Sequence, residues 1–256
     1  MHNTADHGQH LLVDKTVIDQ MVQSVNEGDL VLEIGPGTGE ITKALLQKKA
    51  RVVAIEVDRS YERYLARFHA LEVIYGDVLE IGFPKFEKLV SNLPFHITEP
   101  FIEKLARVNF VEAILLVGGK FAKEAMSKPG DEHFGKMSLV MQCYFKCEHL
   151  AEVKKGSFDP PPRVTAALIR LVPFKPKDFS QRVMRELFDQ RDKKLKNALR
   201  EAIVRICGVT KNQARETIDE MGLPESWLEG NLENLSNEDF VILTHRFGGF
   251  ENVDRD

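Results

Sequence analysis

The sequence predicts an α/β fold in which a mostly parallel sheet is followed by a small all-helical domain. Short apolar runs alternate with helical patterns over the first two thirds of the 256 residues, which is typical of βαβ units in a parallel sheet covered on both faces. Two longer apolar runs then flank a proline-rich segment, as in an antiparallel pair at a sheet edge. After Pro176 every periodic pattern is helical.

The elements of the parallel part follow from the spacing of their apolar residues. The run from Leu30 to Ile34 is apolar except for Glu33 and is followed by Gly35-Pro36-Gly37, so it predicts a buried strand. The next segment has apolar residues three and four apart and lysines near its end, which predicts a helix. The same reasoning predicts strands at residues 30–34, 51–56, 71–75, 88–91 and 111–117, and helices at residues 39–49, 58–69 and 100–107.

The antiparallel pair is expected from residues 139–145 and 164–172. The segment that joins them contains Phe158 and three consecutive prolines. Prolines favour a stiff, extended connection, which would present the phenylalanine. The chain has three cysteines, which is an odd number, and no paired CxxC motif. Two of them, Cys143 and Cys147, lie in or near the first of these predicted strands. We therefore predict core thiols in a reducing cytoplasm.

We predict a domain boundary near residues 174–178, which divides the chain into residues 1–175 and 176–256. A chain of this length can bury a core without disulfides. Its longest apolar runs fall far short of the roughly 20 residues that cross a bilayer, and the first residues lack a signal or transit pattern. Composition therefore excludes membrane, secreted and disordered classes, and nothing in it indicates more than a monomer.

The net charge of −4 is unevenly distributed along the chain. Residues 182–215 contain ten lysines and arginines against four acids, whereas residues 216–256 contain eleven acids against two arginines. A basic stripe of this kind can bind a polyanion inside an acidic protein. A solvated helix face is the alternative, and charge alone does not separate the two.

A glycine-rich turn, residues 33–39, follows the first buried strand and opens a helix. Glycines there let a ligand approach the backbone, although a tight strand-to-helix turn also explains them. Glu56 ends the next strand about 20 residues after Gly35, where an acid binds ribose hydroxyls in such folds. Glu40 stands where a dinucleotide fingerprint has glycine, and its carboxylate disfavours a pyrophosphate. The pattern favours an adenosine cofactor without pyrophosphate, such as S-adenosylmethionine. Asp77 would bind the adenine amino group or cap a helix.

The segment Asn92-Leu93-Pro94-Phe95 falls at the end of the fourth strand, where α/β sheets place ligands. A proline turn with a core phenylalanine is one interpretation. In the other, the Asn92 side-chain carbonyl and the Pro94 backbone carbonyl hold the hydrogens of an adenine amino group, so that its lone pair faces a sulfonium methyl. Phe95 would stack on the base. Positioning then supplies most of the catalysis, without a strong general base or a metal.

These motifs together resemble the ribosomal RNA adenine N6-dimethyltransferase family, whose sister branch is the erythromycin-resistance methylases. The resemblance implies a Rossmann-like class I S-adenosylmethionine-dependent methyltransferase domain over residues 1–175 and a helical RNA-recognition domain over residues 176–256. It extends from Gly8 to about Ala202. It rests on residues 8–12, 33–39, 56–58, 76–78, 92–95, 128–131 and 158–164, and on Phe188, Arg191, Lys193, Leu195, Asn197 and Leu199.

The resemblance also implies a function: dimethylation at N6 of two adjacent adenosines near the 3′ end of small-subunit (16S-type) rRNA, with S-adenosylhomocysteine as the second product. Asn92, Pro94 and Phe95 would be catalytic, and Phe95 and Phe158 would sandwich a flipped-out adenine. The cofactor would be bound by His10, Leu12, Gly35, Gly37, Glu56, Val57, Asp77, Val78 and Asn92. Besides the two phenylalanines, the RNA-binding residues would be Lys154, Lys155, Arg163, Arg191, Lys193 and Lys194.

The expected partner is small-subunit rRNA or a pre-30S-type particle, met in the cytoplasm during ribosome biogenesis and without a membrane. No metal is expected, because His2, His7 and His10 lack a matching set of carboxylates or cysteines.

Three features depart from the family pattern, and one of them is Ala166, where the family often has serine. Gly118-Gly119-Lys120 stands where the family commonly has Gln, then Lys or Arg, then Glu, and we expect the glycines to loosen that turn. Asp192 interrupts a basic run and lowers the local positive potential. Three alternatives remain open: a large-subunit rRNA methylase of the macrolide-resistance type, a non-catalytic RNA-binding assembly or transcription factor, and a DNA adenine methylase. Residues 128–131 and 160–162 favour the small-subunit branch.

Overall fold

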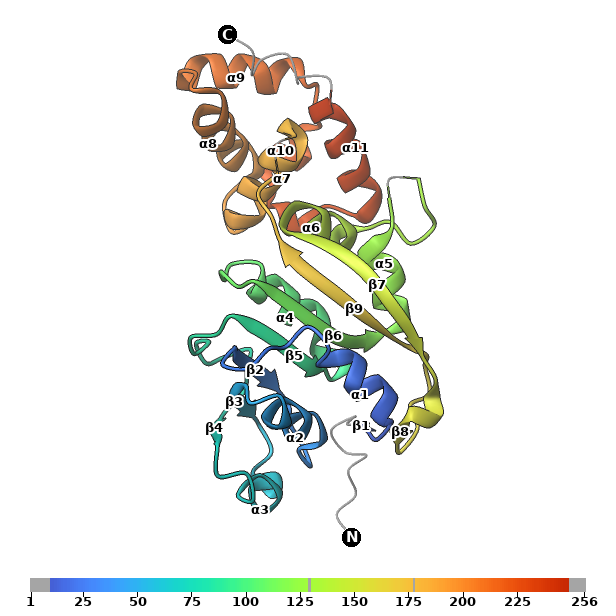
Figure 1. The fold of residues 1–256 in the computed structure, drawn as a ribbon. Coiled ribbons are helices and arrows are strands. Elements are labelled where there is room, and N and C mark those ends of the chain that lie inside the picture. Colours follow the sequence, from blue (N-terminus) through green and yellow to red (C-terminus); the bar gives the residue numbers. More distant parts are fainter. Residues whose placement is uncertain (1–9, 129, 177, 249–256) are drawn as a thin grey trace. The chain divides into compact units, whose positions relative to one another are not determined.

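The computed structural model describes residues 10–128, 130–176 and 178–248 and shows two compact units (Figure 1). The first is formed by residues 1–123 and 145–173, the second by residues 124–144 and 174–256. The second unit thus includes residues 124–144, which the sequence analysis assigns to the first domain. His2, His7 and the start of the first motif lie outside the described residues.

The strands of the first unit are β1 (Leu11–Leu12), β2 (Leu30–Ile34), β3 (Arg51–Glu56), β4 (Leu71–Tyr75), β5 (Lys88–Asn92), β6 (Glu112–Gly118), β7 (Phe145–Val153), β8 (Phe158–Asp159) and β9 (Ala166–Pro173). Seven of them form one sheet in the order β4-β3-β2-β5-β6-β9-β7. The first five in this order are parallel, and β9 runs antiparallel to both β6 and β7. A second, short sheet pairs β1 with β8.

The parallel strands lie where the apolar runs predict them. The bounds of β2, β3 and β4 are confirmed to the residue, and β6 is shifted by one residue. β5 is one residue longer than predicted, so that Asn92 is its last residue. Because parallel strands end at the same edge of a sheet, Asn92 shares the carboxyl edge with Gly35 and Glu56.

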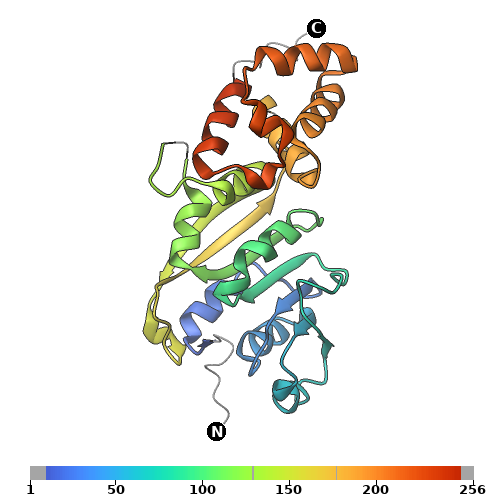
Figure 2. The same ribbon diagram turned by 180° about the vertical axis from the view of Figure 1, so that it is seen from behind.

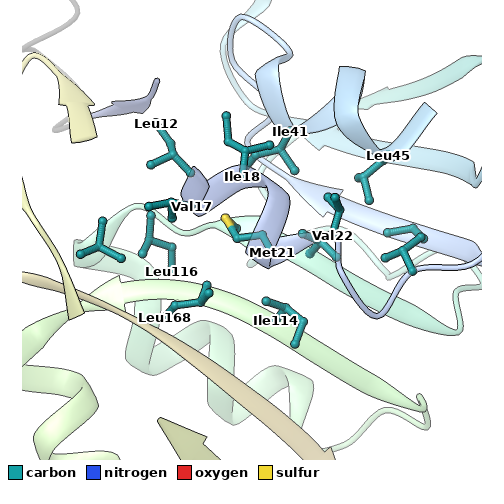
Figure 3. Packing of buried hydrophobic residues seen from close by; sticks show 14 of the residues in the cluster. Leu12, Val17, Ile18, Met21, Val22, Ile41, Leu45, Ile114, Leu116 and Leu168 are labelled. Atoms are coloured by element: carbon teal, nitrogen blue, oxygen red, sulfur yellow. The ribbon is translucent and has the colours of Figure 1, made fainter. Parts of the chain in front are cut away.

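Helices cover both faces of this sheet. On one face α1 (Lys15–Met21) and α2 (Glu40–Gln47) contribute to a buried apolar cluster together with β6 and β9 (Figure 3). On the other face lies α4 (Thr98–Leu105), with Phe101, Ile102 and Leu105 buried (Figure 2). The cluster in Figure 3 includes Leu12, Val17, Ile18, Met21, Val22, Ile41, Leu45, Ile114, Leu116 and Leu168. Its burial against the sheet fixes the strand ends that carry the site.

The predicted strand at residues 139–145 is wrong. The segment is the helix α6 (Lys136–Tyr144), and β7 begins where the predicted strand ends. Almost every side chain of α6 is buried, so its apolar run has no polar face, and a short run of this kind does not distinguish a helix from a strand. The antiparallel pair itself exists as β7 with β9. Cys143 is therefore a buried helical residue and Cys147 a half-buried residue of β7.

The helix predicted at residues 58–69 is much shorter. Asp58 accepts a hydrogen bond from the Ser60 backbone N–H, which starts the segment as a 3-10 turn, η2 (Arg59–Tyr61). A single helical turn follows, α3 (Glu62–Leu65). The Leu71 N–H then bonds the Phe68 carbonyl at 3.0 Å and turns the chain into β4.

The described part of the second unit is helical, as predicted beyond Pro176. Phe188 and Phe240 stack in its core, with ring centroids 6.1 Å apart. Besides α6 and the end of α5 (Gly119–Met126), its helices are α7 (Phe179–Asp189), α8 (Leu195–Cys207), α9 (Lys211–Glu220), α10 (Glu225–Glu229) and α11 (Asn237–Gly248).

Candidate active site

The candidate site lies at the carboxyl edge of the sheet, where β2 and β5 separate. The two strands pair only at Val31↔Lys88 and Leu32↔Leu89. Beyond these pairs the two strands are joined by a side chain, because Ser91 Oγ donates to the Ile34 carbonyl at 2.7 Å. The strand order reverses direction between these two strands, and such a switch point is where open α/β sheets bind ligands.

A pocket at this edge is lined by residues from three separate parts of the chain. The first segment, the glycine-rich turn and the segment after β5 all contribute. Six of the lining residues belong to the predicted site, and Leu11 and Leu93 complete the wall. The lining residues are His10, Leu11, Gly35, Gly37, Asn92, Leu93, Pro94 and Phe95.

The Asn92 amide is oriented by a backbone carbonyl. Its Nδ2 donates to the His10 carbonyl oxygen at 2.7 Å, although the two residues are 82 positions apart. His10 is itself held, because its Nδ1 lies 2.8 Å from the Pro160 carbonyl oxygen. The hydrogen bond from Nδ2 thus orients the amide. The other end of the amide, Oδ1, makes no hydrogen bond with the described residues and can accept one from a ligand.

Pro94 and Phe95 follow Asn92 at the pocket. The Pro94 carbonyl accepts from the Ile97 N–H at 3.1 Å and from Thr98 Oγ1 at 3.4 Å. Its predicted contact with a substrate amine would share the carbonyl with these donors. The Phe95 ring is half-buried and lies 6.3 Å from the His10 ring, centroid to centroid.

The two glycines after the fifth parallel strand do not loosen the turn, contrary to the expectation. Gly118 is the last paired residue of β6, opposite Ala166, and the Gly119 N–H donates to the Thr165 carbonyl at 2.8 Å. A Cβ on Gly118 would lie 3.5 Å from the Phe95 ring, and one on Gly119 would overlap the Thr165 side chain. The position of Gly118 thus has room for a Cβ in ordinary contact with Phe95, whereas the position of Gly119 has none because of Thr165.

Glu56 is a buried carboxylate at the end of β3, with 1 % of its surface exposed. It accepts hydrogen bonds from the Gly37 N–H at 3.1 Å and the Asp58 N–H at 2.9 Å. Burial raises the pKa of Glu56, and these two backbone donors act against the rise. Gly37 has φ +54°, and a Cβ there would lie 2.9 Å from the Leu11 side chain. Glycine at this position thus lets the turn approach both Glu56 and Leu11.

The other predicted cofactor residues surround this edge in different ways. Val57 is 60 % exposed beside the buried Glu56, an apolar surface suited to a base, whereas Val78 and Leu12 are 4 % exposed. Asp77 accepts from the Leu79 N–H at 2.8 Å. This bond closes a turn at residues 78–80 and does not cap a helix, since no helix lies between β4 and β5. The contact of Asp77 with an adenine stays a prediction.

Phe158 does not line the pocket. It pairs with Leu12 in the β1–β8 sheet, is 2 % exposed and belongs to the apolar cluster of Figure 3. An adenine cannot stack on a ring buried in this way, so the predicted sandwich would need Phe158 to move. Lys154, Lys155 and Arg163 are exposed near it, and Lys155 Nζ donates to the Arg163 carbonyl.

The predicted RNA-binding residues of the second unit are all ion-paired. Lys193 Nζ lies 2.6 Å from Glu201 Oε2 and Lys194 Nζ 2.8 Å from Glu229 Oε2. Arg191 Nε is 3.4 Å from Glu233 Oε1. Lys196 and Arg205 likewise pair with Glu229 and Glu186. Five of the ten cations of the basic stripe are thus paired with acids of their own unit.

Glu33 is a buried carboxyl behind the glycine-rich turn that the sequence analysis does not assign to the site. It is 1 % exposed, and Thr42 Oγ1 donates to its Oε2 at 2.6 Å. Burial, followed by repulsion from Glu56, raises the pKa of Glu33 to about 8. The sequence does indicate this buried carboxyl, since Glu33 is the one acid in an otherwise apolar strand.

The raised pKa of Glu33 predicts a pH-dependent stability. Between the unfolded value near 4.5 and the folded value of about 8, the folded state binds a proton that the unfolded state lacks. Stability should therefore fall as the pH rises through this window, by up to about 1.4 kcal/mol per pH unit. Glu33→Gln mimics the neutral acid and should remove the part of this slope that Glu33 contributes, leaving the part that comes from the raised pKa of Glu56. Urea unfolding at pH 5 to 8 measures it, and equal slopes in both proteins would contradict the assignment.

The described residues contain neither a metal-binding cluster nor a membrane-spanning helix. No group of three or more His, Cys, Asp and Glu side chains gathers there in a way that could hold a metal ion. Within the same residues no helix is long and apolar enough to cross a membrane.

The strand order, the glycine-rich turn and the carboxylate at the end of β3 define a Rossmann-like, S-adenosylmethionine-dependent methyltransferase. The chain matches the family described as "Ribosomal RNA adenine dimethylase" over residues 2–220 and belongs to that family.

Two relatives are similar to this chain in sequence over most of its length. A "Probable ribosomal RNA small subunit methyltransferase A" of Methanosarcina barkeri is 37 % identical over 248 residues, which cover 91 % of this chain and 84 % of the relative. The protein of that description from Pyrococcus abyssi is 35 % identical over 201 residues, 76 % of this chain and 75 % of the relative.

Two solved structures extend the comparison. A dimethyladenosine transferase from Plasmodium falciparum has a TM-score of 0.63 and 25 % identity, covering 94 % of this chain and 98 % of its own. The 23S rRNA methyltransferase ErmE has a TM-score of 0.58 and 21 % identity, covering 93 % and 99 %, and shares the fold.

Proposed function

We propose that this protein transfers methyl groups from S-adenosylmethionine to N6 of two adjacent adenosines near the 3′ end of small-subunit rRNA, giving dimethyladenosine at each. The observation that carries the proposal is the Asn92 amide, whose Nδ2 is bound to the His10 carbonyl while Oδ1 is left to accept. Family membership and the names of the relatives support the small-subunit rRNA as substrate.

The chain's own residues would act by positioning. Asn92 Oδ1 accepts one N6 hydrogen of the target adenine. The Pro94 carbonyl oxygen accepts the other N6 hydrogen and shares this role with its existing donors, the Ile97 N–H and Thr98 Oγ1. Held in this way, the amine is biased towards sp³ and its lone pair is aimed at the methyl group. As the N–C bond forms and the bond from sulfur to the methyl group breaks, N6 becomes acidic and releases one proton to solvent. Phe95 offers a ring face on which the base can stack. Orientation of this kind can supply most of the rate enhancement when the electrophile is already activated.

The pocket residues fit an adenosine cofactor. The buried Glu56 carboxylate would accept from the ribose hydroxyls, the exposed Val57 would contact the adenine, and Asp77 its amino group. Gly35 and Gly37 keep the wall free of side chains, and His10, Leu12, Val78 and Asn92 complete the predicted set. S-adenosylmethionine supplies the activated methyl group and leaves as S-adenosylhomocysteine. We propose that no metal takes part, because the leaving group is already activated.

The RNA partner requires surfaces beyond the pocket. We propose that residues 1–175 carry the chemistry and residues 176–256 recognise the rRNA or a pre-30S-type particle. Phosphates would compete with Glu201, Glu229 and Glu233 for the paired cations, and Lys154, Lys155 and Arg163 would hold the RNA near Phe158. The protein is proposed to act as a monomer in the cytoplasm.

The proposal is tested by transfer of labelled methyl groups. The protein would be given S-adenosylmethionine with small subunits lacking the modification and, separately, with large-subunit RNA. We expect dimethyladenosine in the digested small-subunit RNA alone. Label confined to large-subunit RNA would move the protein to the resistance methylases. No label, with cofactor binding intact, would favour an assembly factor.

A further inference from the structure

Three arginines lie four residues apart in the segment that follows β3. Arg59, Arg63 and Arg67 are all exposed. Arg59 begins η2, Arg63 lies within α3 and Arg67 just after it. The three therefore follow one another along the 3-10 turn, the single α-helical turn and the residues directly after it. We call Arg59, Arg63 and Arg67 the arginine ladder.

Each guanidinium of the ladder lies over an aromatic ring. Arg59 Cζ is 4.6 Å from the centroid of Tyr75, at the end of β4. The corresponding distances are 4.7 Å for Arg63 over Tyr64 and 4.8 Å for Arg67 over Phe68. Stacking orders the planar group before any ligand arrives, which lowers the entropy lost on binding.

The ladder keeps most of its charge available. Arg59 and Arg63 make no ion pair with any described residue, and Arg67 approaches Glu40 only at 3.9 Å. Hydrogen bonds to Tyr64 Oη and to the Thr38 carbonyl engage one Nη2 each of Arg63 and Arg67. Glu62 is the single acid between Arg59 and Arg67. This contrasts with the basic stripe, where Arg191, Lys193, Lys194, Lys196 and Arg205 are all paired.

The position of the ladder suits a nucleic acid that reaches the pocket. The segment leaves the sheet directly after Glu56, at the carboxyl edge that also carries Gly35 and Asn92. Figure 1 shows α3 beside β4 at this end of the first unit. Planar, stacked guanidinium groups match phosphate geometry, and their outer faces can stack on unpaired bases.

We infer that the arginine ladder is a second RNA-binding surface, which contacts phosphates of the substrate RNA outside the target adenosines. The inference rests on the proposed function, since it takes the substrate to be RNA. It adds a further RNA contact in the first unit, besides Lys154, Lys155 and Arg163, that the basic composition of residues 182–215 does not indicate.

The test compares two full-length double variants with the same change in charge. Arg59→Gln with Arg63→Gln removes two of the three positive charges of the arginine ladder. The matched control, Arg51→Gln with Arg107→Gln, removes two exposed arginines near the opposite, amino edge of the same sheet. Binding of unmethylated small-subunit rRNA is measured at several salt concentrations, and S-adenosylmethionine binding reports that each variant is folded.

Loss of two phosphate contacts should weaken RNA binding about 10-fold at 0.1 M salt and lower the slope of log K against log salt by about 1.4 to 1.8. The control should stay within about 2-fold of wild type. Arg59→Lys with Arg63→Lys keeps the charges and should retain most of the slope. If the ladder variant binds like the control, the inference is overturned while the proposed function stands. If wild type itself binds neither the rRNA nor unmethylated small subunits, both are overturned.

Discussion

Replacing Asn92 with alanine is expected to lower methyl transfer about 100- to 1,000-fold, the cost of removing one hydrogen-bonding group that acts in a transition state. The structure gives the reason for a selective effect. Asn92 Nδ2 is held by the His10 carbonyl at 2.7 Å, so the side chain is fixed with Oδ1 as its remaining acceptor. Alanine removes the acceptor without changing Gly35, Glu56 or Val57, and the affinity for S-adenosylmethionine should change much less.

Turnover under single-turnover conditions and cofactor binding by calorimetry measure the two effects separately. Asn92→Asp is an informative partner variant, because it keeps an acceptor oxygen but loses the donor to His10. It should retain more turnover than alanine and bind the cofactor no better than wild type. Unchanged turnover in Asn92→Ala would remove this side chain from the mechanism. Thermal unfolding shows whether either variant has lost its fold.

The parallel half of the sheet was predictable because its strands are short, mainly apolar runs bounded by glycine or charged residues. The runs of β2, β3 and β4 have one plausible interpretation each, and their bounds are confirmed. The same local reasoning fails at α6, whose burial on all sides removes the period that identifies a helix. That burial comes from packing within the second unit, which no local pattern contains.

The residues of the pocket were predictable from the sequence, but their orientation and burial were not. The sequence motifs name His10, Gly35, Gly37, Asn92, Pro94 and Phe95, and the structure brings these residues to one pocket. The orientation of the Asn92 amide could not be predicted, because its partner is a backbone carbonyl far away in the chain. The burial of Phe158 also depends on a distant contact, the pairing of β8 with β1.

Charge was the least predictable property of the surface. A count along residues 182–215 finds an excess of cations, but it does not find Glu229 and Glu233 from the following acidic segment beside Lys194 and Arg191. Two cations on Glu229 lower the pKa of that carboxyl to about 2, so its charge persists at any ordinary pH. The exposed pairs add little stability in water. Their effect is to reduce the positive potential offered to a polyanion.

Glu56→Ala is expected to reduce the affinity for S-adenosylmethionine about 100-fold. A hydrogen bond to a charged group is worth about 1.5 to 3 kcal/mol, and alanine removes an acceptor from the ribose and leaves the Gly37 and Asp58 N–H groups without their carboxylate partner. Glu62→Ala is the matched control, since Glu62 is an exposed acid six positions later with the same charge. It should bind the cofactor like wild type.

A pH titration sharpens the Glu56 prediction beyond a loss of structure. Burial raises the pKa of Glu56, and only the ionised carboxylate offers acceptors on both oxygens. Cofactor affinity in the wild type should therefore fall as the pH is lowered through this raised value, since protonation converts one acceptor into a donor. Glu56→Gln is neutral at every pH and should bind weakly without this dependence. Calorimetric titrations with S-adenosylmethionine between pH 5 and 8 measure both proteins, and a wild-type affinity that is flat with pH and equal to that of Glu56→Gln would show that the Glu56 carboxylate does not hold the ribose.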